Sequence, residues 1–188
     1  MNVLRLGFIL MLVGAISAGG LAFVYFQTKP IIEQRRVAEL KLAILEVLPS
    51  TISFQELNNS ELKPLDDSAM TITNIYLGFG SEENPVGVAI KGVTEEGYGG
   101  PIVILIGISI DNKITGIEII EHRETPGLGS KIAEAPFIGM FLSKNINDPL
   151  TINEDLTAIT GATQSSEAVA KLVRKVADYV LRNREAWR

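Results

Sequence analysis

The stretch PIVILIGISI, residues 101–110, decides the fold of this chain. Isoleucine recurs at every second position from Ile102 to Ile110, so in an extended strand these side chains lie on one face. Val103 and Leu105 are apolar on the opposite face. A strand that is apolar on both faces is typical of one that other elements cover on both sides. We therefore expect this strand to be central in a sheet.

The neighbouring segments have the same period of two. TITNIYLGF (71–79), PVGVAIKGV (85–93) and KITGIEIIE (113–121) are each predicted to be a strand. DNK at 111–113 is typical of a tight turn, which predicts a hairpin between the strands on either side of it. Residues 51–70 are mostly polar, and the stretch NNSELKPLDDS within them, residues 58–68, is expected to form a loop.

Two helical segments are predicted in the C-terminal half, at 130–142 and 165–186. The second carries one apolar stripe at helical spacing, formed by Val169, Leu172, Val173, Val176 and Val180. Strands followed by helices indicate an α+β domain, here over residues 51–188, with a mainly antiparallel sheet flanked by helices. A domain of this length is large enough to bury a hydrophobic core.

Residues 6–26 contain no charged side chain. As a helix with a rise of about 1.5 Å per residue they span about 31 Å, which matches the hydrocarbon core of a bilayer. A cleaved signal peptide is the alternative, with AIS at 15–17 as its cleavage site, but the apolar run continues beyond that site to Phe26. We therefore expect residues 1–26 to be an uncleaved, single-pass membrane anchor.

Residues 27–50 are predicted to be an amphipathic connector helix between the anchor and the domain. Pro30 suits the first turn of a helix, and Pro49 ends it. The apolar residues between them recur at helical spacing with charges interleaved; they are Val37, Leu40, Ile44 and Val47.

The 188 residues carry a formal net charge of -5, with no cysteine and a single histidine, His122. The acidic balance argues against a nucleic-acid partner. The lack of cysteine excludes disulfides, thiol catalysis and cysteine-ligated iron–sulfur or zinc sites. If the protein handles electrons, it therefore needs an organic cofactor. No metal site and no catalytic residue is predicted.

Three glycine-bearing stretches interrupt the predicted elements: GYGGPI (97–102), ETPGLGS (124–130) and TGATQSS (160–166). Each has a local explanation, namely a loop, a type II turn and a helix start capped by Ser165 or Ser166. The third also has a chemical explanation, because a helix start rich in N–H and O–H groups can hold or bond a phosphate. Neither a dinucleotide fingerprint nor a Walker motif is present.

Taken together, these stretches resemble a known family. The chain is similar over its whole length to the G subunit of the Rnf complex and to the homologous C subunit of sodium-translocating NADH:quinone reductase. The resemblance is carried by an N-terminal anchor and a connector helix, followed in order by GYGGPI, ETPGLGSKI and TGAT.

The resemblance implies a flavoprotein in which FMN is joined by a phosphoester bond to the last threonine of a Ser/Thr-Gly-Ala-Thr motif, here Thr163. It also implies a separate flavin transferase that makes this bond with FAD as donor. The family commonly has aspartate three residues before the motif. This chain has Thr157 there, with Asp155 nearby.

The other site residues follow from the same resemblance. At the phosphate, the helix N-terminus is expected to supply N–H donors, with space left by Gly161 and Ala162 and further hydrogen bonds from Thr160, Ser165 and Ser166. At the isoalloxazine ring, Glu124, Thr125, Gly127, Leu128 and Gly129 are expected to form a loop whose backbone amides and Leu128 contact the ring, with Tyr98 lining the same site. Lys131 is interpreted as a solvated lysine rather than a phosphate partner. His122 is interpreted as a structural residue rather than a proton donor to the flavin.

The function implied is an electron relay whose partners are the other membrane subunits of the complex. In an Rnf complex, electron transfer between ferredoxin and NAD is coupled to the movement of sodium ions or protons. This chain has no nicotinamide fingerprint and no intramembrane carboxylate, so no independent catalytic activity is expected. The alternative is a non-redox, membrane-anchored ligand-binding or scaffold domain.

The resemblance also implies a single-pass protein of the cytoplasmic membrane, with a cytoplasmic N-terminus and a flavin domain outside the cytoplasm. The positive charges alone argue the other way, because only Arg5 precedes the apolar run. Four basic residues follow it before the domain: Lys29, Arg35, Arg36 and Lys41. Long domains translocate largely regardless of charge, so the resemblance decides this prediction.

Overall fold

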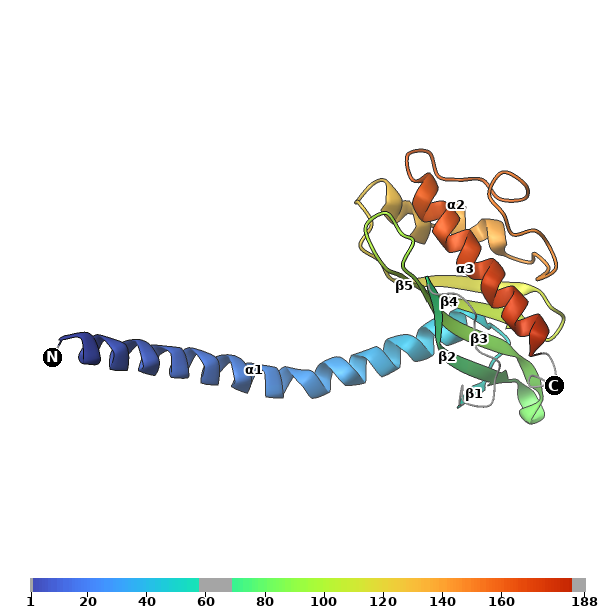
Figure 1. Ribbon diagram of the computed structural model, residues 1–188. Coiled ribbons are helices and arrows are strands. Elements are labelled where there is room, and N and C mark those ends of the chain that lie inside the picture. The colour runs from blue at the N-terminus through green and yellow to red at the C-terminus, as the bar shows by residue number, and fades with distance from the viewer. Residues whose placement is uncertain (1, 58–68, 184–188) are drawn as a thin grey trace. The chain divides into compact units, whose positions relative to one another are not determined.

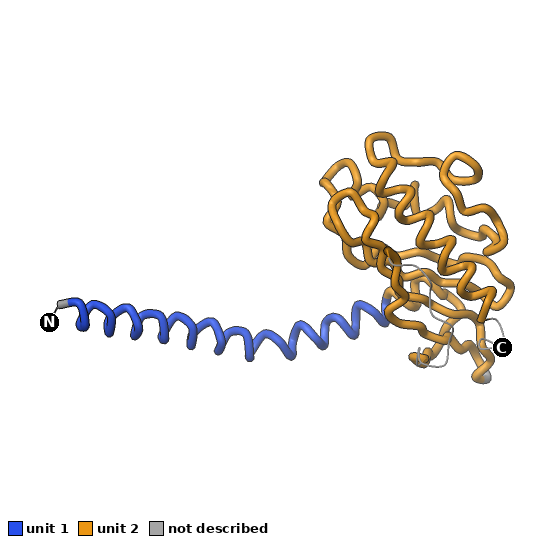
Figure 2. The backbone as a smooth tube through the Cα atoms, viewed as in Figure 1, with its two compact units in different colours: residues 1–42 blue, residues 43–188 orange. Residues whose placement is uncertain are grey.

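The computed structural model describes residues 2–57 and 69–183 and consists of two compact units. The first is Met1–Leu42 and the second is Ala43–Arg188 (Figure 2). The loop predicted at 58–68 and the end of the helix predicted at 165–186 lie outside the described residues.

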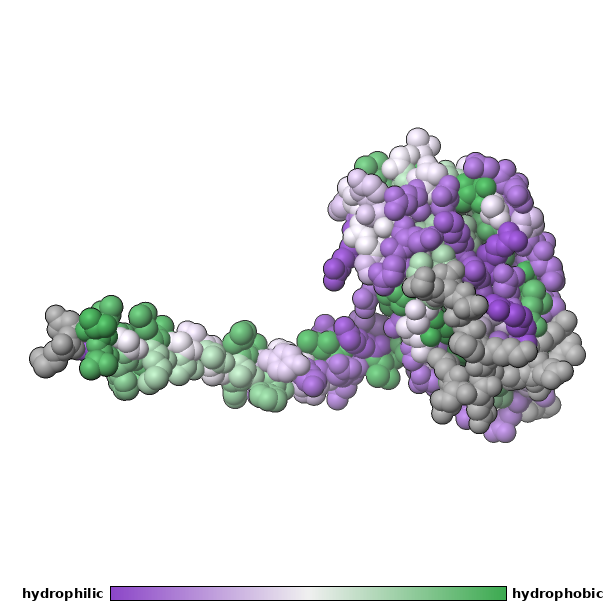
Figure 3. Space-filling view, in the orientation of Figure 1, coloured by the Kyte–Doolittle hydropathy of each residue, from purple (hydrophilic) through white to green (hydrophobic). Residues whose placement is uncertain are grey.

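Helix α1 runs from Asn2 to Val47 with Pro30 inside it, and its part up to Leu42 forms the first unit. The predicted anchor and connector are therefore parts of one helix, with no break between residues 26 and 27. By length and composition α1 is the one helix among the described residues that could cross a membrane. Its N-terminal part shows a largely hydrophobic surface (Figure 3), with exposed side chains that include Leu6, Phe8, Leu10, Met11, Leu21 and Phe23. Apolar surface of this extent indicates a lipid or partner-helix environment.

The second unit is built on a five-stranded antiparallel sheet in the order β1-β2-β3-β4-β5. Its strands are β1 (Ser53–Leu57), β2 (Met70–Phe79), β3 (Pro85–Thr94), β4 (Ile102–Ser109) and β5 (Ile114–Glu121); a 3-10 turn, η2 (Ser81–Glu83), joins β2 to β3. The antiparallel sheet, the four predicted strands and the β4–β5 hairpin are confirmed. Strand β1, at the sheet edge, was not predicted; it lies in the mostly polar segment 51–70, just before the predicted loop. Strand β4 lies inside the sheet between β3 and β5, and side chains on both of its faces are buried, as predicted for 101–110, although the middle strand of the sheet is β3.

Helix α3 (Thr163–Arg182) covers one face of this sheet (Figure 1). The predicted apolar stripe of α3 is buried and packs with the isoleucines of β4 in the main core. Gly92 of β3 leaves room for this helix, because a Cβ there would lie 3.1 Å from Leu172 Cδ1. Ile110, the last of the expected row, is 53% exposed because it lies beyond the end of β4.

The last turn of α1 belongs to the second unit and packs on the other face of the sheet. Side chains alternate along β4, so Gly107 faces away from Ile104 and α3. A Cβ at Gly107 would overlap the carbonyl of Val47, which also accepts a hydrogen bond from Thr115 Oγ1. Within the predicted connector stripe, Ile44 and Val47 are buried whereas Val37 is 68% exposed.

The helix predicted at 130–142 is replaced by three short turns: η3 (Gly129–Ala133), α2 (Ala135–Ile138) and η4 (Gly139–Phe141). The interruption falls at Glu134, whose backbone is extended, with φ -86° and ψ 147°. Pro136 follows it and lacks the N–H that would continue a helix from the preceding turn. The turns bury Ile132, Phe137 and Phe141 against the core.

Candidate flavin site

The topology brings two of the three glycine-bearing stretches to one end of the sheet. GYGG connects β3 to β4, and ETPGLG follows β5. Because the pairing is antiparallel, Thr94 at the end of β3 lies beside Ile102, and Val103 lies beside Glu121 at the end of β5. Both loops therefore leave the sheet at the same end.

Glu124 joins these two loops to the start of α3. Its side chain is only 5% exposed. Its Oε1 accepts the N–H of Gly99, with 3.2 Å between the atoms, and its Oε2 accepts the hydroxyl of Ser165 at 2.8 Å. The three glycine-bearing stretches thus meet at one buried carboxylate.

Two glycines lie against this carboxylate. A Cβ at Gly129 would overlap Glu124 Oε2. A Cβ at Gly97 would first overlap the carbonyl of Gly100 and would also lie 2.8 Å from Glu124 Oε1. Gly129 is itself buried. The ring contacts expected from the backbone amides of this loop and from Leu128 stay predictions.

Gly127, by contrast, is exposed and has φ +76°, with nothing within 4 Å of a Cβ placed on it. Its conformation belongs to a turn that Ser130 closes, since Ser130 Oγ accepts the N–H of Gly127 at 2.9 Å. The turn leaves Thr125 and Leu128 exposed, the latter by 48%. Leu128 is therefore free to contact a ligand.

The TGAT motif lies at the start of α3, as expected, but the residue at the N-cap position differs from the prediction. Gly161 has φ +81°, and a Cβ there would lie 3.3 Å from Leu128 Cδ2, so this motif lies against the ETPGLG loop. The helix begins at Thr163, with Ala162 as the N-cap residue. The prediction that Ser165 or Ser166 caps the helix was wrong, because both lie inside its first turns.

The two serines are buried and their hydroxyl groups bond to protein acceptors. Ser165 donates to Glu124. Ser166 Oγ donates to the carbonyl of Ala162 at 2.9 Å and accepts the N–H of Ile159 at 3.0 Å. In place of the expected donation to a phosphate, these contacts fold the TGAT loop and attach it to its neighbour.

The residues around Thr163 fit a phosphate-linked flavin. Thr160, Gly161 and Thr163 are exposed, and in the described part of the chain no side chain caps the α3 N-terminus. Its first N–H groups and its dipole therefore favour an anion. Tyr98, 73% exposed, supplies an apolar ring surface on the GYGG loop.

A further contact, which the sequence did not suggest, holds the GYGG loop beside the helix. Gln164 Nε2 donates to the carbonyl of Glu96 at 3.1 Å, and the carboxylate of Glu96 pairs with Lys171 at 3.0 Å. Gln164 lies in the TGATQSS stretch, but Glu96 and Lys171 belong to no motif, so no sequence signal identified these contacts.

His122 contacts the backbone of the ETPGLG loop, and Lys131 is solvent-exposed. His122 Nδ1 accepts the N–H of Glu124 at 3.2 Å, which orients the start of the ETPGLG loop. Lys131 is exposed in η3. A cavity of about 540 Å³ lies at the edge of the sheet beside His122 and Arg123 and is lined by neither Leu128 nor Thr163.

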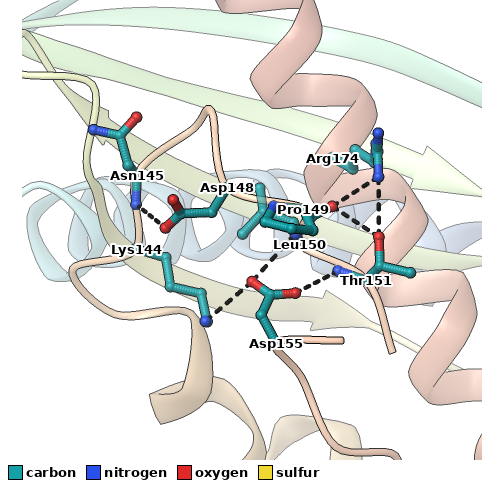
Figure 4. A network of polar contacts seen from close by, with 8 residues as sticks. All are labelled: Lys144, Asn145, Asp148, Pro149, Leu150, Thr151, Asp155 and Arg174. Atoms are coloured by element: carbon teal, nitrogen blue, oxygen red, sulfur yellow. Dashed lines mark hydrogen bonds and ion pairs between the residues drawn. The ribbon is translucent and has the colours of Figure 1, made fainter. Parts of the chain in front are cut away.

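The loop before the TGAT motif is held by Asp155 (Figure 4). Its carboxylate accepts the N–H groups of Thr151 at 2.8 Å and Leu150 at 3.2 Å and pairs with Lys144 at 3.0 Å. Burial alone raises the pKa of Asp155, but these N–H groups and the Lys144 ammonium hold it below its usual value. Arg174 of α3 fixes the same loop by donating to Thr151 Oγ1 at 3.0 Å. Asp155 therefore shapes the chain and is not directed outward.

Comparison with known proteins identifies the class of this domain. The sequence profile of the FMN-binding domain family matches residues 97–178, which contain all three glycine-bearing stretches. Two crystal structures have the same fold. NqrC of Shewanella oneidensis has a TM-score of 0.57 at 14% identity, over 73% of this chain and 89% of that one. The C subunit of the Na(+)-translocating NADH-quinone reductase of Parabacteroides distasonis has a TM-score of 0.56 at 18% identity, over 81% of this chain and 94% of that one. The second unit is an FMN-binding domain.

The relatives of the whole chain narrow this class to one family. The profile of the RnfG N-terminal region matches residues 1–47. The G subunit of the ion-translocating oxidoreductase complex of Methanosarcina acetivorans is 34% identical over 91% of this chain and 90% of its own length. The G subunit of the Na(+)-translocating ferredoxin:NAD(+) oxidoreductase complex of Acetobacterium woodii is 32% identical over 89% of this chain and 86% of its own length. The chain belongs to the family of G subunits of Rnf-type ion-translocating oxidoreductase complexes, which are electron-transport flavoproteins with FMN as cofactor.

Proposed function

We propose that Thr163 carries FMN as a phosphoester and that this flavin relays electrons within an Rnf-type complex. The observation that carries the proposal is the position of Thr163: it is the exposed first residue of an α-helix that no side chain caps among the described residues. An ester there places the phosphate at the positive end of the helix. Leu128, beside Gly161, lies close enough to the motif to contact the attached ring system.

Attachment requires a flavin transferase with FAD as donor. The new bond joins Thr163 Oγ to the phosphorus of the FMN half, the pyrophosphate bond of FAD breaks, and AMP leaves. The hydroxyl proton passes to a base of the transferase. The exposure of Thr163 is compatible with access by a second protein.

As a relay, this protein exchanges electrons with other membrane subunits of a complex that couples ferredoxin:NAD electron transfer to ion translocation. When bound, FMN supplies the redox chemistry, while this chain binds and orients it. We also propose that the N-terminus is cytoplasmic and that the domain lies on the outer side of the membrane, where the transferase acts.

The experiment is mass spectrometry of the peptide containing Thr163, from full-length protein co-expressed with the transferase. The expected result is an FMN phosphoester on Thr163. An unmodified Thr163 in a protein whose flavin survives denaturation would place the ester elsewhere. A colourless protein under these conditions would favour a non-redox binding or scaffold domain.

A further inference from the structure

The buried carboxylate of Glu124 is the point at which the three glycine-bearing stretches meet. One oxygen accepts from Gly99 in the GYGG loop, 25 residues away along the chain, and the other accepts from Ser165 in the first turn of α3, 41 residues away. Within the described residues, neither ion pair involves Glu124. A buried carboxylate needs hydrogen bonds to offset its desolvation, and here these bonds come from two separate segments of the chain.

The packing around Gly129 is specific to the Glu124 side chain, because the three atoms nearest to a Cβ placed at Gly129 all belong to Glu124. Ser165, the donor to Oε2, lies only two residues after Thr163, within the same helical turn. A movement of the carboxylate would therefore change the position of the exposed Thr163 relative to the GYGG and ETPGLG loops.

We propose that Glu124 is a positioning residue for flavin attachment: it assembles the three loops in the flavin-free chain and so presents Thr163 to the transferase. This inference rests on the proposed attachment at Thr163. It assigns Glu124 no contact with the ring, because both of its oxygens bond to the protein and its side chain is 5% exposed.

The first test needs no flavin. Hydrogen exchange of the Gly99 amide is measured in full-length protein made without the transferase. Glu124→Ala removes the acceptor of the Gly99 N–H. Exchange at Gly99 is therefore expected to become about tenfold faster, which is the change in the opening equilibrium that the loss of one hydrogen bond produces. Glu124→Gln retains an oxygen for Gly99 and is expected to keep most of the protection. The control is Glu121→Gln, which changes an exposed carboxylate three residues earlier.

The second test measures flavin attachment by fluorescence of the denatured protein after co-expression with the transferase. Glu124→Ala is expected to lower attachment about tenfold, and Glu124→Gln to restore most of it. Val176→Ala controls for stability, since Val176 is buried in α3 about three turns from Ser165. If Glu124→Ala fails to fold, Ser165→Ala removes one of the two bonds and takes its place.

The outcomes separate this inference from the proposed function. Unchanged Gly99 exchange in Glu124→Ala overturns the role of Glu124, whatever the site of attachment. Equal loss of attachment in Val176→Ala and Glu124→Ala also overturns it, because general destabilisation then explains both. Faster Gly99 exchange together with flavin on a residue other than Thr163 overturns the proposed attachment while supporting the assembly of the loops.

Discussion

The hydroxyl group of Ser165 donates a hydrogen bond to Glu124 Oε2 across 2.8 Å, in a place where both residues are buried. The bond links the first turn of α3 to the loop after β5, although 41 residues separate the two in the chain. A helix start that is fixed in this way holds its exposed first residue, Thr163, in a defined direction.

Thr163→Ala is expected to give a folded domain without covalent flavin, because alanine has no hydroxyl to form the ester. Thr163 is exposed at the helix start, so the free energy of unfolding should change by less than about 1 kcal/mol. Fluorescence of the denatured band on a gel measures the bound flavin. The matched control is Thr160→Ala, in the same motif. A Thr163→Ala band as bright as wild type would show that another hydroxyl carries the flavin.

Gly129→Ala is expected to destabilise the domain by about 1–3 kcal/mol, because the added methyl group overlaps the Glu124 carboxylate. Thermal unfolding followed by circular dichroism measures the change. Gly139→Ala is the control, since Gly139 has φ -59° and nothing within 4 Å of an added Cβ. It should leave the stability unchanged or raise it slightly. Equal effects of the two substitutions would contradict the close packing of Gly129 on Glu124.

Acid should weaken the loop before the TGAT motif, because the folded state holds the pKa of Asp155 below its unfolded value. A depressed carboxyl pKa stabilises the fold at pH values above the unfolded pKa, near 3.9. This contribution is lost as the pH falls from there through the folded pKa. Asp155→Asn should therefore lower the free energy of unfolding at pH 7 by about 1–2 kcal/mol. The deficit relative to wild type should shrink towards pH 3. A deficit independent of pH would contradict the ionic part of this contact.

The control for Asp155→Asn is Asp111→Asn, an exposed change in the β4–β5 turn. Unfolding midpoints of both variants and of wild type are measured between pH 3 and pH 7. The Asp111 variant is expected to follow wild type within about 0.5 kcal/mol throughout.

The sidedness of the membrane protein is tested with Ser81→Cys, at an exposed position of η2 in a chain that has no other cysteine. A membrane-impermeant maleimide is expected to label this cysteine in intact cells. The unsubstituted chain gives the background. Labelling only after lysis would place the domain in the cytoplasm and would remove the proposed place of flavin attachment.

Most of the sheet was predictable because alternation of apolar side chains is a local property of the sequence. Strands β2 to β5 follow segments with a clear period of two. Strand β1 does not, since SFQEL is short, mostly polar and only half-buried at its apolar positions. The prediction of a single helix at 130–142 was wrong for a local reason, because the extended backbone at Glu134 interrupts the segment.

The site was predictable only in part. The motif residues were chosen by resemblance, and the structure brings their loops together. The partners of Glu124, Ser165 and Gln164 were not predictable, because each contacts a residue that is distant in sequence. Whether a carboxylate faces a ligand or is buried depends on the packing of the whole domain, and this packing cannot be predicted from a local sequence pattern.

The strand order has a consequence for the sequence of events during synthesis. Every strand pairs with the next one along the chain, so the sheet has a low contact order and can form by successive hairpins while the chain is being made. Helix α3 is the last element and must join across long sequence separations. Thr163, the proposed acceptor, therefore reaches its final surroundings only when α3 packs on the sheet. A modifying enzyme that needs the assembled loops works on the finished chain, so a truncated or stalled product would not consume flavin.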